Sequence, residues 1–132
     1  MAYPTGSGSE RLMRGTVQAL TNTTTALLFN GSNGTTVNQE TNEVPANHII
    51  TMVSMVFCNV HSSTAELKMY IECASPTDAI HLLSKQAIGV DSTFVWNDKF
   101  VLQGGDHLIV HLNASGNTDV QYSYIDQDWT TP

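Results

Sequence analysis

The longest apolar stretch of the chain runs over residues 49–60 and reads IITMVSMVFCNV. In an extended strand successive side chains point to opposite faces. One face would carry Ile50, Met52, Val56 and Cys58, and the other would carry Ile49, Val53, Met55 and Phe57. A buried helix is the alternative, but the β-branched residues and the preceding Pro45 favour a strand. The pattern predicts a central strand with one face in its own core and the other against the second sheet or a neighbouring subunit.

Elsewhere the apolar positions alternate with polar ones, which is typical of half-buried strands. Leu67, Met69, Ile71 and Cys73 alternate with Glu66, Lys68, Tyr70 and Glu72. Leu108, Val110 and Leu112 form an inward stripe, and Val120, Tyr122 and Tyr124 form another. Residues 79–90 fit a strand or a short helix.

Turn residues separate these runs, with two Asn-Gly pairs in residues 30–34 and a Gly-Gly-Asp turn at residues 104–106. Short strands at regular spacing predict an all-β fold, an antiparallel β-sandwich or jelly roll. We expect a flexible N-terminal arm over residues 1–13, since it contains a Gly-Ser-Gly-Ser spacer, and a single β-sandwich domain over residues 14–132.

The composition is light in charge and acidic, with 5 Lys and Arg residues against 12 Asp and Glu residues and a formal net charge of −7. The chain has no basic stripe for a phosphate backbone or an anionic lipid surface, so nucleic acid and membrane are not expected partners. The first residues lack the apolar core of a signal peptide, and no apolar run approaches the ~20 residues of a membrane span.

Candidate chemistry is sparse. Cys58 and Cys73 lie in apolar runs and are expected to be buried thiols, with a disulfide between neighbouring strands as the alternative. His107 and His111 would share a strand face about 13 Å apart, too far for one metal ion. Asp106 is expected to cap its own turn. No nucleophile, phosphate-loop or Ca²⁺-loop motif is present, so we expect no enzyme activity, cofactor or metal.

Aromatic side chains offer a second reading, a sugar-stacking surface. Its candidate residues are Tyr70, Trp96, Tyr122 and Tyr124. Aromatic residues on strands more often pack in the core or pair across the sheet. Rings exposed around a groove would favour glycan binding, and rings buried between sheets would favour a structural role.

Two segments, EVPANHIITMVSMVFCNVHSS and KFVLQGGDHLIVHLNASGNTDVQYSYID, resemble small structural proteins of tailed bacteriophages. The matching positions are Val44-Pro45-Ala46-Asn47, Asn59, Val101-Leu102, Gly105-Asp106, Leu108 and Ser123-Tyr124. The likeness covers roughly residues 43–126. Such relatives are tail, fibre, neck and head-surface components, so the location on the particle stays open.

The resemblance implies a non-enzymatic virion protein, made in the host cytoplasm, that decorates or cements the capsid or serves as a neck or tail accessory. Its expected partners are further copies of itself, with a trimer slightly preferred, and other virion proteins such as the major capsid or tail protein. A receptor- or glycan-binding module of a tail or head fibre is the alternative. The candidate interface residues are Arg11, Leu12, Met13, Arg14, Ile49, Val53, Met55 and Phe57. The first four would anchor the arm on a neighbour or on the capsid shell.

Overall fold

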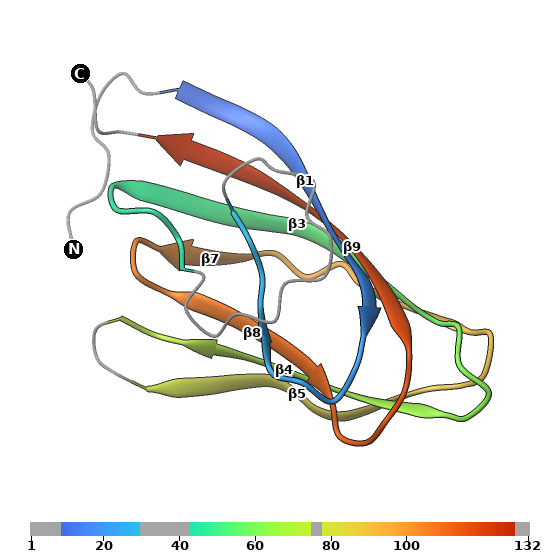
Figure 1. Ribbon diagram of the computed structural model, residues 1–132. Coiled ribbons are helices and arrows are strands. Elements are labelled where there is room, and N and C mark those ends of the chain that lie inside the picture. The colour runs from blue at the N-terminus through green and yellow to red at the C-terminus, as the bar shows by residue number, and fades with distance from the viewer. Residues whose placement is uncertain (1–8, 30–42, 75–77, 129–132) are drawn as a thin grey trace.

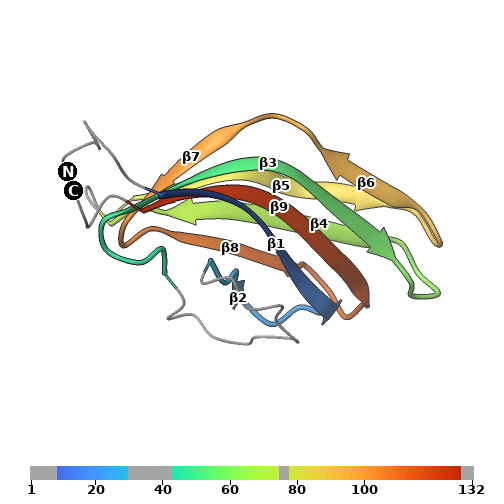
Figure 2. The same ribbon diagram turned by 90° about the horizontal axis from the view of Figure 1, so that it is seen from above.

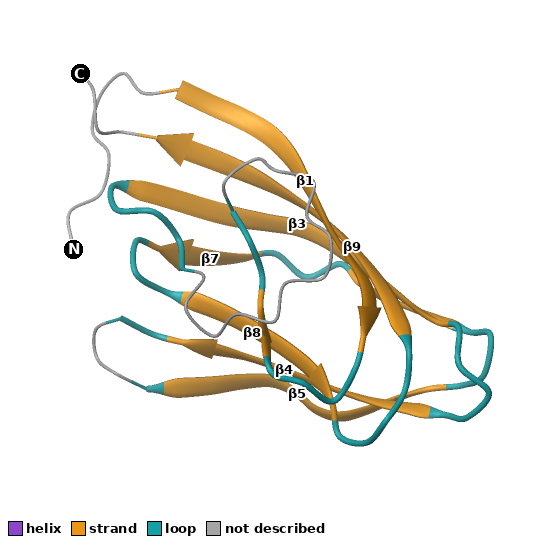
Figure 3. Ribbon diagram, viewed as in Figure 1, coloured by secondary structure: helices purple, strands orange, loops and turns teal. Residues whose placement is uncertain are grey.

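The computed structural model describes residues 9–29, 43–74 and 78–128, and every regular element in this part of the chain is a β-strand (Figure 3). The strands are β1 (Ser9–Leu20), β2 (Thr25–Ala26), β3 (His48–Asn59), β4 (Ala65–Glu72), β5 (Ala79–Ile88), β6 (Thr93–Trp96), β7 (Phe100–Gln103), β8 (His107–Leu112) and β9 (Thr118–Asp128). All strand pairs are antiparallel. The predicted all-β, antiparallel β-sandwich is therefore confirmed, and residues 79–88 form a strand rather than a helix.

Two sheets form the layers of the sandwich (Figures 1 and 2). Sheet A has the order β1-β9-β3, and β6 and β7 share the far edge of β3, each pairing with one half of it. Sheet B has the order β2-β8-β4-β5. The chain crosses repeatedly between the layers, so strands that are neighbours in space come from distant parts of the sequence.

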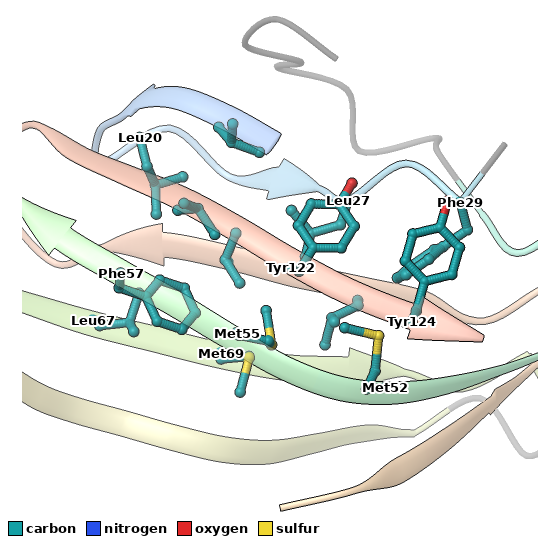
Figure 4. Packing of buried hydrophobic residues seen from close by; sticks show 14 of the residues in the cluster. Leu20, Leu27, Phe29, Met52, Met55, Phe57, Leu67, Met69, Tyr122 and Tyr124 are labelled. Atoms are coloured by element: carbon teal, nitrogen blue, oxygen red, sulfur yellow. The ribbon is translucent and has the colours of Figure 1, made fainter. Parts of the chain in front are cut away.

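The core lies between the two sheets and contains side chains from both (Figure 4). The predicted inward stripes of β8, of β9 and of Leu67 and Met69 on β4 are all buried. The largest fully buried side chains include Phe29, Phe57, Tyr122 and Tyr124. Phe29 contacts the edges of both tyrosine rings, with centroid distances of 5.8 and 5.0 Å. The quadrupoles of aromatic rings favour this edge-to-face geometry.

Strand β3 differs from its prediction because a β-bulge interrupts its alternation. The register with β9 shifts between Met52 and Ser54, so one extra residue, Val53, enters the strand there. Ile50 and Met52 point into the core before the bulge, and Met55 and Phe57 point into the core after it. Strict alternation would place Met55 and Phe57 on the opposite face from Ile50, so that prediction is wrong. The strand has one fully buried face, not two.

Residues 9–13, which were predicted to belong to a flexible N-terminal arm, are instead part of a strand. Strand β1 begins at Ser9 and pairs with β9 in the register Ser9↔Asp128 to Val17↔Val120. Residues 9–13 are therefore part of the sandwich, because the alternation of Met13 and Val17 toward the core extends the sheet. Residues 1–8 lie outside the described residues, as does the Asn-Gly turn at residues 30–34.

Two turns that are far apart in sequence fasten to each other at one end of the sandwich. The Val44 N–H donates to the Asp106 carbonyl, and the Gly105 N–H donates to the Val44 carbonyl, each at 2.9 Å. The Asp106 carboxylate accepts from the Gln103 N–H at 2.8 Å within its own turn, which confirms the predicted cap. It also accepts from the Ala74 N–H at 2.9 Å, so it joins this turn to the end of β4.

Asn59 plays the same fastening role at the other end of β3. Its side chain is fully buried, and its amide donates to the carbonyls of Ser63 at 2.8 Å, Ile88 at 3.0 Å and Gly89 at 3.2 Å. Its side-chain oxygen accepts from the His61 N–H at 3.0 Å. One side chain therefore holds the β3–β4 loop against the end of β5.

Candidate interaction surface

The outer face of sheet A, which points away from the core, is the most distinctive surface of the described residues. It comprises Glu10, Leu12, Arg14, Thr16 and Gln18 of β1; Asp119, Gln121, Ser123, Ile125 and Gln127 of β9; Ile49, Thr51, Val53, Ser54, Val56 and Cys58 of β3; and Thr93, Val95, Val101 and Gln103 of β6 and β7. Most of these side chains are apolar, hydroxyl or amide groups. Only three of them carry a charge at neutral pH.

An apolar row crosses this face from edge to edge. Leu12 pairs with Ile125, Ile125 pairs with Thr51, and Thr51 pairs with Val101. Leu12 is 74% exposed, Val101 52% and Ile125 36%. Directly paired positions have Cβ atoms about 5 Å apart, so the row is a continuous apolar ridge with a threonine methyl in its middle.

A shallow hollow of about 400 Å³ lies on the same face, beyond the apolar row. Its lining comes from β1, β3 and β9 and consists of Thr16, Val17, Gln18, Val56, Cys58, Asp119, Val120 and Gln121. Val95, which is 48% exposed, pairs with Val56 beside it. The apolar row and the hollow together give this face an uneven surface.

The outer face of sheet B has a different chemistry. Its side chains include the charged Glu66, Lys68 and Glu72, with Tyr70 between them. The Tyr70 ring lies 5.1 Å from the His81 ring and 6.4 Å from the His111 ring, and the Lys68 ammonium lies 5.8 Å from its centroid. Sheet B therefore presents polar and ionisable groups to its surroundings, which sheet A largely lacks.

The predicted interface residues are divided between surface and core. Leu12 and Arg14 are exposed, whereas Val53 is half-buried and Ile49 is buried on the outer face of sheet A. Met13 packs against the core. Met55 and Phe57 have no exposed surface, so the prediction that they contact a neighbour is wrong, and the bulge is the reason.

Arg11, the remaining predicted interface residue, has an acidic partner in its own chain. Its guanidinium lies 3.5 Å from the carboxylate of Asp126, which is 2% exposed. His48 Nδ1 lies 2.7 Å from the other oxygen of the same carboxylate, and His48 Nε2 lies 3.7 Å from Asp128. The buried carboxylate is thus contacted from β1 and from β3, the two neighbours of β9, so its polar contacts join all three strands at this end of sheet A.

The four aromatic residues considered for sugar binding do not meet on one surface. Tyr122 and Tyr124 are 2% and 1% exposed and stack on each other in the core with centroids 5.8 Å apart. The Tyr122 hydroxyl donates to the Leu28 carbonyl at 2.7 Å, and burial raises the pKa of this phenol far above its usual value. Trp96 is half-buried at the edge of sheet A, and Tyr70 lies on the far side of sheet B. These four residues therefore do not form one glycan-binding surface, and that prediction is wrong.

The cysteines and histidines do not converge on a reactive centre. Cys58 and Cys73 are free and half-exposed, which corrects the expectation of buried thiols, because Cys58 follows the bulge onto the outer face and Cys73 follows the end of β4. Burial, then the carboxylates of Asp106 and Asp78, raise the pKa of the Cys73 thiol. In the described part of the chain no three His, Cys, Asp or Glu side chains are placed to hold a metal ion. No helix among the described residues could span a membrane.

Val95, Val101 and Ile125 share a surface location that was not predicted from the sequence. Each of them stands out only as an apolar residue at an outward position of an alternating strand. Their proximity depends on strand order, which the linear sequence does not reveal.

No family model and no curated protein matches this chain. Among solved structures, one of Bacillus endospore appendages, described as a novel family of disulfide-linked pili, has a TM-score of 0.50 at 8% identity and covers 98% of this chain and 97% of that chain. The xylan-binding domain CBM22-1 of Paenibacillus barcinonensis Xyn10C has a TM-score of 0.38 at 18% identity and covers 67% of this chain and 60% of that chain. At such identities the likeness to the pilus protein extends to the fold alone.

Proposed function

We propose that this chain is a non-enzymatic structural protein of a tailed-phage virion, which decorates or reinforces the particle through subunit–subunit contacts. The observation that carries the proposal is the exposed apolar row Leu12–Ile125–Val101 on a face with few charges. Contiguous exposed apolar surface on a small domain marks an interaction site.

The resemblance to phage structural proteins supports the virion context, and several of the residues that carry it fasten loops in this structure. Val44 and Gly105-Asp106 belong to the two turns that bond to each other, and Asn59 holds the β3–β4 loop. These residues maintain a loop arrangement rather than a reacting centre. Such a signature fits a protein whose role is to keep its shape within an assembly.

The fold is also compatible with a building-block role, because the Bacillus appendage protein with the same architecture forms pili. The second reading, a glycan-binding module, required aromatic rings exposed around a groove. Two of the four candidate rings are instead buried between the sheets, so the structural role is preferred.

Mass spectrometry and immunogold electron microscopy of gradient-purified particles test the proposal. We expect the chain in intact virions at a copy number that matches a symmetric site, with the gold label on head, neck or tail. A chain that is abundant in the infected-cell lysate but absent from washed particles would refute the virion role. Particles that lack the chain should retain their shape but lose integrity sooner on heating or dilution of divalent ions.

A further inference from the structure

We infer that two copies of this chain pair through the outer face of sheet A, with the twofold axis parallel to the strands. The inference rests on the proposed function in one respect, namely that the chain acts through subunit–subunit contacts. It names the surface, the partner and the orientation. It predicts an interface between sheets, in which each copy covers the apolar row of the other.

The distribution of exposed apolar side chains points to this face. Seven large apolar side chains are strongly exposed among the described residues, and four of them lie here: Leu12, Val95, Val101 and Ile125. The remaining three, Val60, Ile80 and Val90, are dispersed over two loops and the edge strand β5. Singly exposed apolar residues are normal, but four on one sheet face form a patch.

The size of the face meets the need of a stable dimer. Four strand positions at ~4.8 Å give a width of about 19 Å, and the nine residues from Glu10 to Gln18 at ~3.3 Å give a length of about 30 Å. The flat area is therefore roughly 600 Å², and side-chain relief adds to it. Stable interfaces begin at about 600 Å² per partner, with about 800 Å² typical.

The strand pairing selects the orientation. With the axis parallel to the strands, β1 of one copy faces β6 and β7 of the other, and each cross-strand row meets its own counterpart. Leu12 then opposes Val101 of the second copy, and Ile125 opposes its Thr51. Leu12 and Val101 then cover each other, and Ile125 meets the methyl group of Thr51.

The charges of the face agree with the same orientation. Glu10 opposes Gln103 of the second copy, and Asp119 opposes its Cys58, so neither of these carboxylates meets a like charge. With the axis across the strands, Leu12 would instead oppose Thr16, and Ile125 would oppose Gln121. That arrangement covers the apolar row with polar groups.

The edges of the sheets are less suited to pairing than the face. Strand β1 is interrupted by a register shift between Val17 and Leu20, where Ala19 has a φ of 61°. Strand β5 shifts register twice against β4. Bulges on edge strands oppose edge-to-edge addition of another chain.

Sedimentation equilibrium or light scattering of the full chain tests the pairing. We expect a dimer at micromolar concentration, and Leu12→Ser combined with Val101→Ser and Ile125→Ser should raise its Kd roughly 100-fold or more. The matched control is Val60→Ser combined with Val90→Ser, which removes exposed apolar groups elsewhere and should leave the Kd unchanged. Both variants change exposed residues and should keep the wild-type circular dichroism. A wild-type monomer or trimer, or equal weakening by the control, would overturn the inference.

Cysteine pairs test the orientation in a background with Cys58→Ser and Cys73→Ser. Leu12→Cys with Val101→Cys should give a covalent dimer on mild oxidation, because these positions lie about 14 Å apart within one copy and cannot bond internally. Leu12→Cys with Thr16→Cys should give little. The reverse result would overturn the parallel axis. A monomeric chain that is nevertheless found in purified virions would refute this inference while the proposed function stands.

Discussion

Replacing Asn59 tests how far one buried amide stabilises this sandwich. The side chain makes four hydrogen bonds, with donor–acceptor distances between 2.8 and 3.2 Å, and has no exposed surface. At a net ~1 kcal/mol per bond, and with buried carbonyls left unpaired, Asn59→Ala should cost about 3–4 kcal/mol of unfolding free energy. A chain of this length has about 7–20 kcal/mol in total, so the variant should still fold. Its Tm should fall by roughly 10–15 °C.

The measurement is urea unfolding followed by circular dichroism, with calorimetry for Tm. Asn113→Ala is the matched control, since that amide is exposed and donates one long bond of 3.4 Å to the Ser84 carbonyl. We expect the control to change the unfolding free energy by less than about 0.5 kcal/mol. A cost below about 1 kcal/mol for Asn59→Ala would show that solvent or loop movement replaces the bonds, and the reasoning would fail.

The isosteric change Asn59→Asp separates hydrogen bonding from packing. It keeps the shape of the side chain but turns an oxygen toward the carbonyls of Ser63, Ile88 and Gly89. Burial and these carbonyls would raise the pKa of the new carboxyl in the folded state, because only its protonated form can donate to them. The variant should therefore be most stable, relative to wild type, at acid pH, and should lose stability as pH rises through the folded-state pKa. A difference from wild type that is constant between pH 5.5 and pH 8 would contradict this account.

Two further predictions concern single sites. Gly15→Ala should destabilise the fold by about 1–3 kcal/mol in urea unfolding, because a Cβ at this position would overlap the buried Tyr122 ring. Gly89→Ala should change the unfolding free energy by less than about 1 kcal/mol, because its Cβ would meet only a rotatable serine hydroxyl. An equal cost for the two would show that the Tyr122 ring moves freely. Burial first, and the neighbouring carboxylates second, raise the pKa of the Cys73 thiol. With the other cysteine replaced by serine, the rate of Cys73 alkylation should therefore reach its midpoint at a higher pH than for an unhindered thiol. Asp78→Asn should lower that midpoint. A midpoint that Asp78→Asn leaves unchanged would remove the contribution of Asp78 from this explanation, while burial and Asp106 would remain.

Local sequence signals correctly predicted many of the side chains that point into the core, and one turn. The alternation of Leu67 and Met69 and of Tyr122 and Tyr124 identified the inward faces correctly, and the Asp106 turn was correct down to its capping bond. These features depend on neighbours within a few residues. Period-two burial and turn chemistry are therefore readable from the chain alone.

The bulge at Val53 could not be predicted from the same signals. A one-residue insertion moves every later side chain to the opposite face, and it is visible only in the pairing with β9. The run of apolar residues concealed the shift, because either phase of the strand offers enough apolar side chains for a core. Because of this ambiguity, the prediction placed Met55 and Phe57 on the wrong face and Cys58 in the wrong environment.

The bulge also changes what the apolar run says about partners. Without it, the run indicated a second buried face within β3 itself; with it, the outer side of β3 carries the moderately polar Thr51 and Ser54 beside Val56. The evidence for a partner therefore moves from one continuous segment to Leu12, Ile125 and Val101, which come from three strands and meet only through the strand order. A surface assembled from distant segments exists only in the folded chain. The proposed interface therefore depends on the pairing of β1, β9, β3 and β7 that places these residues side by side.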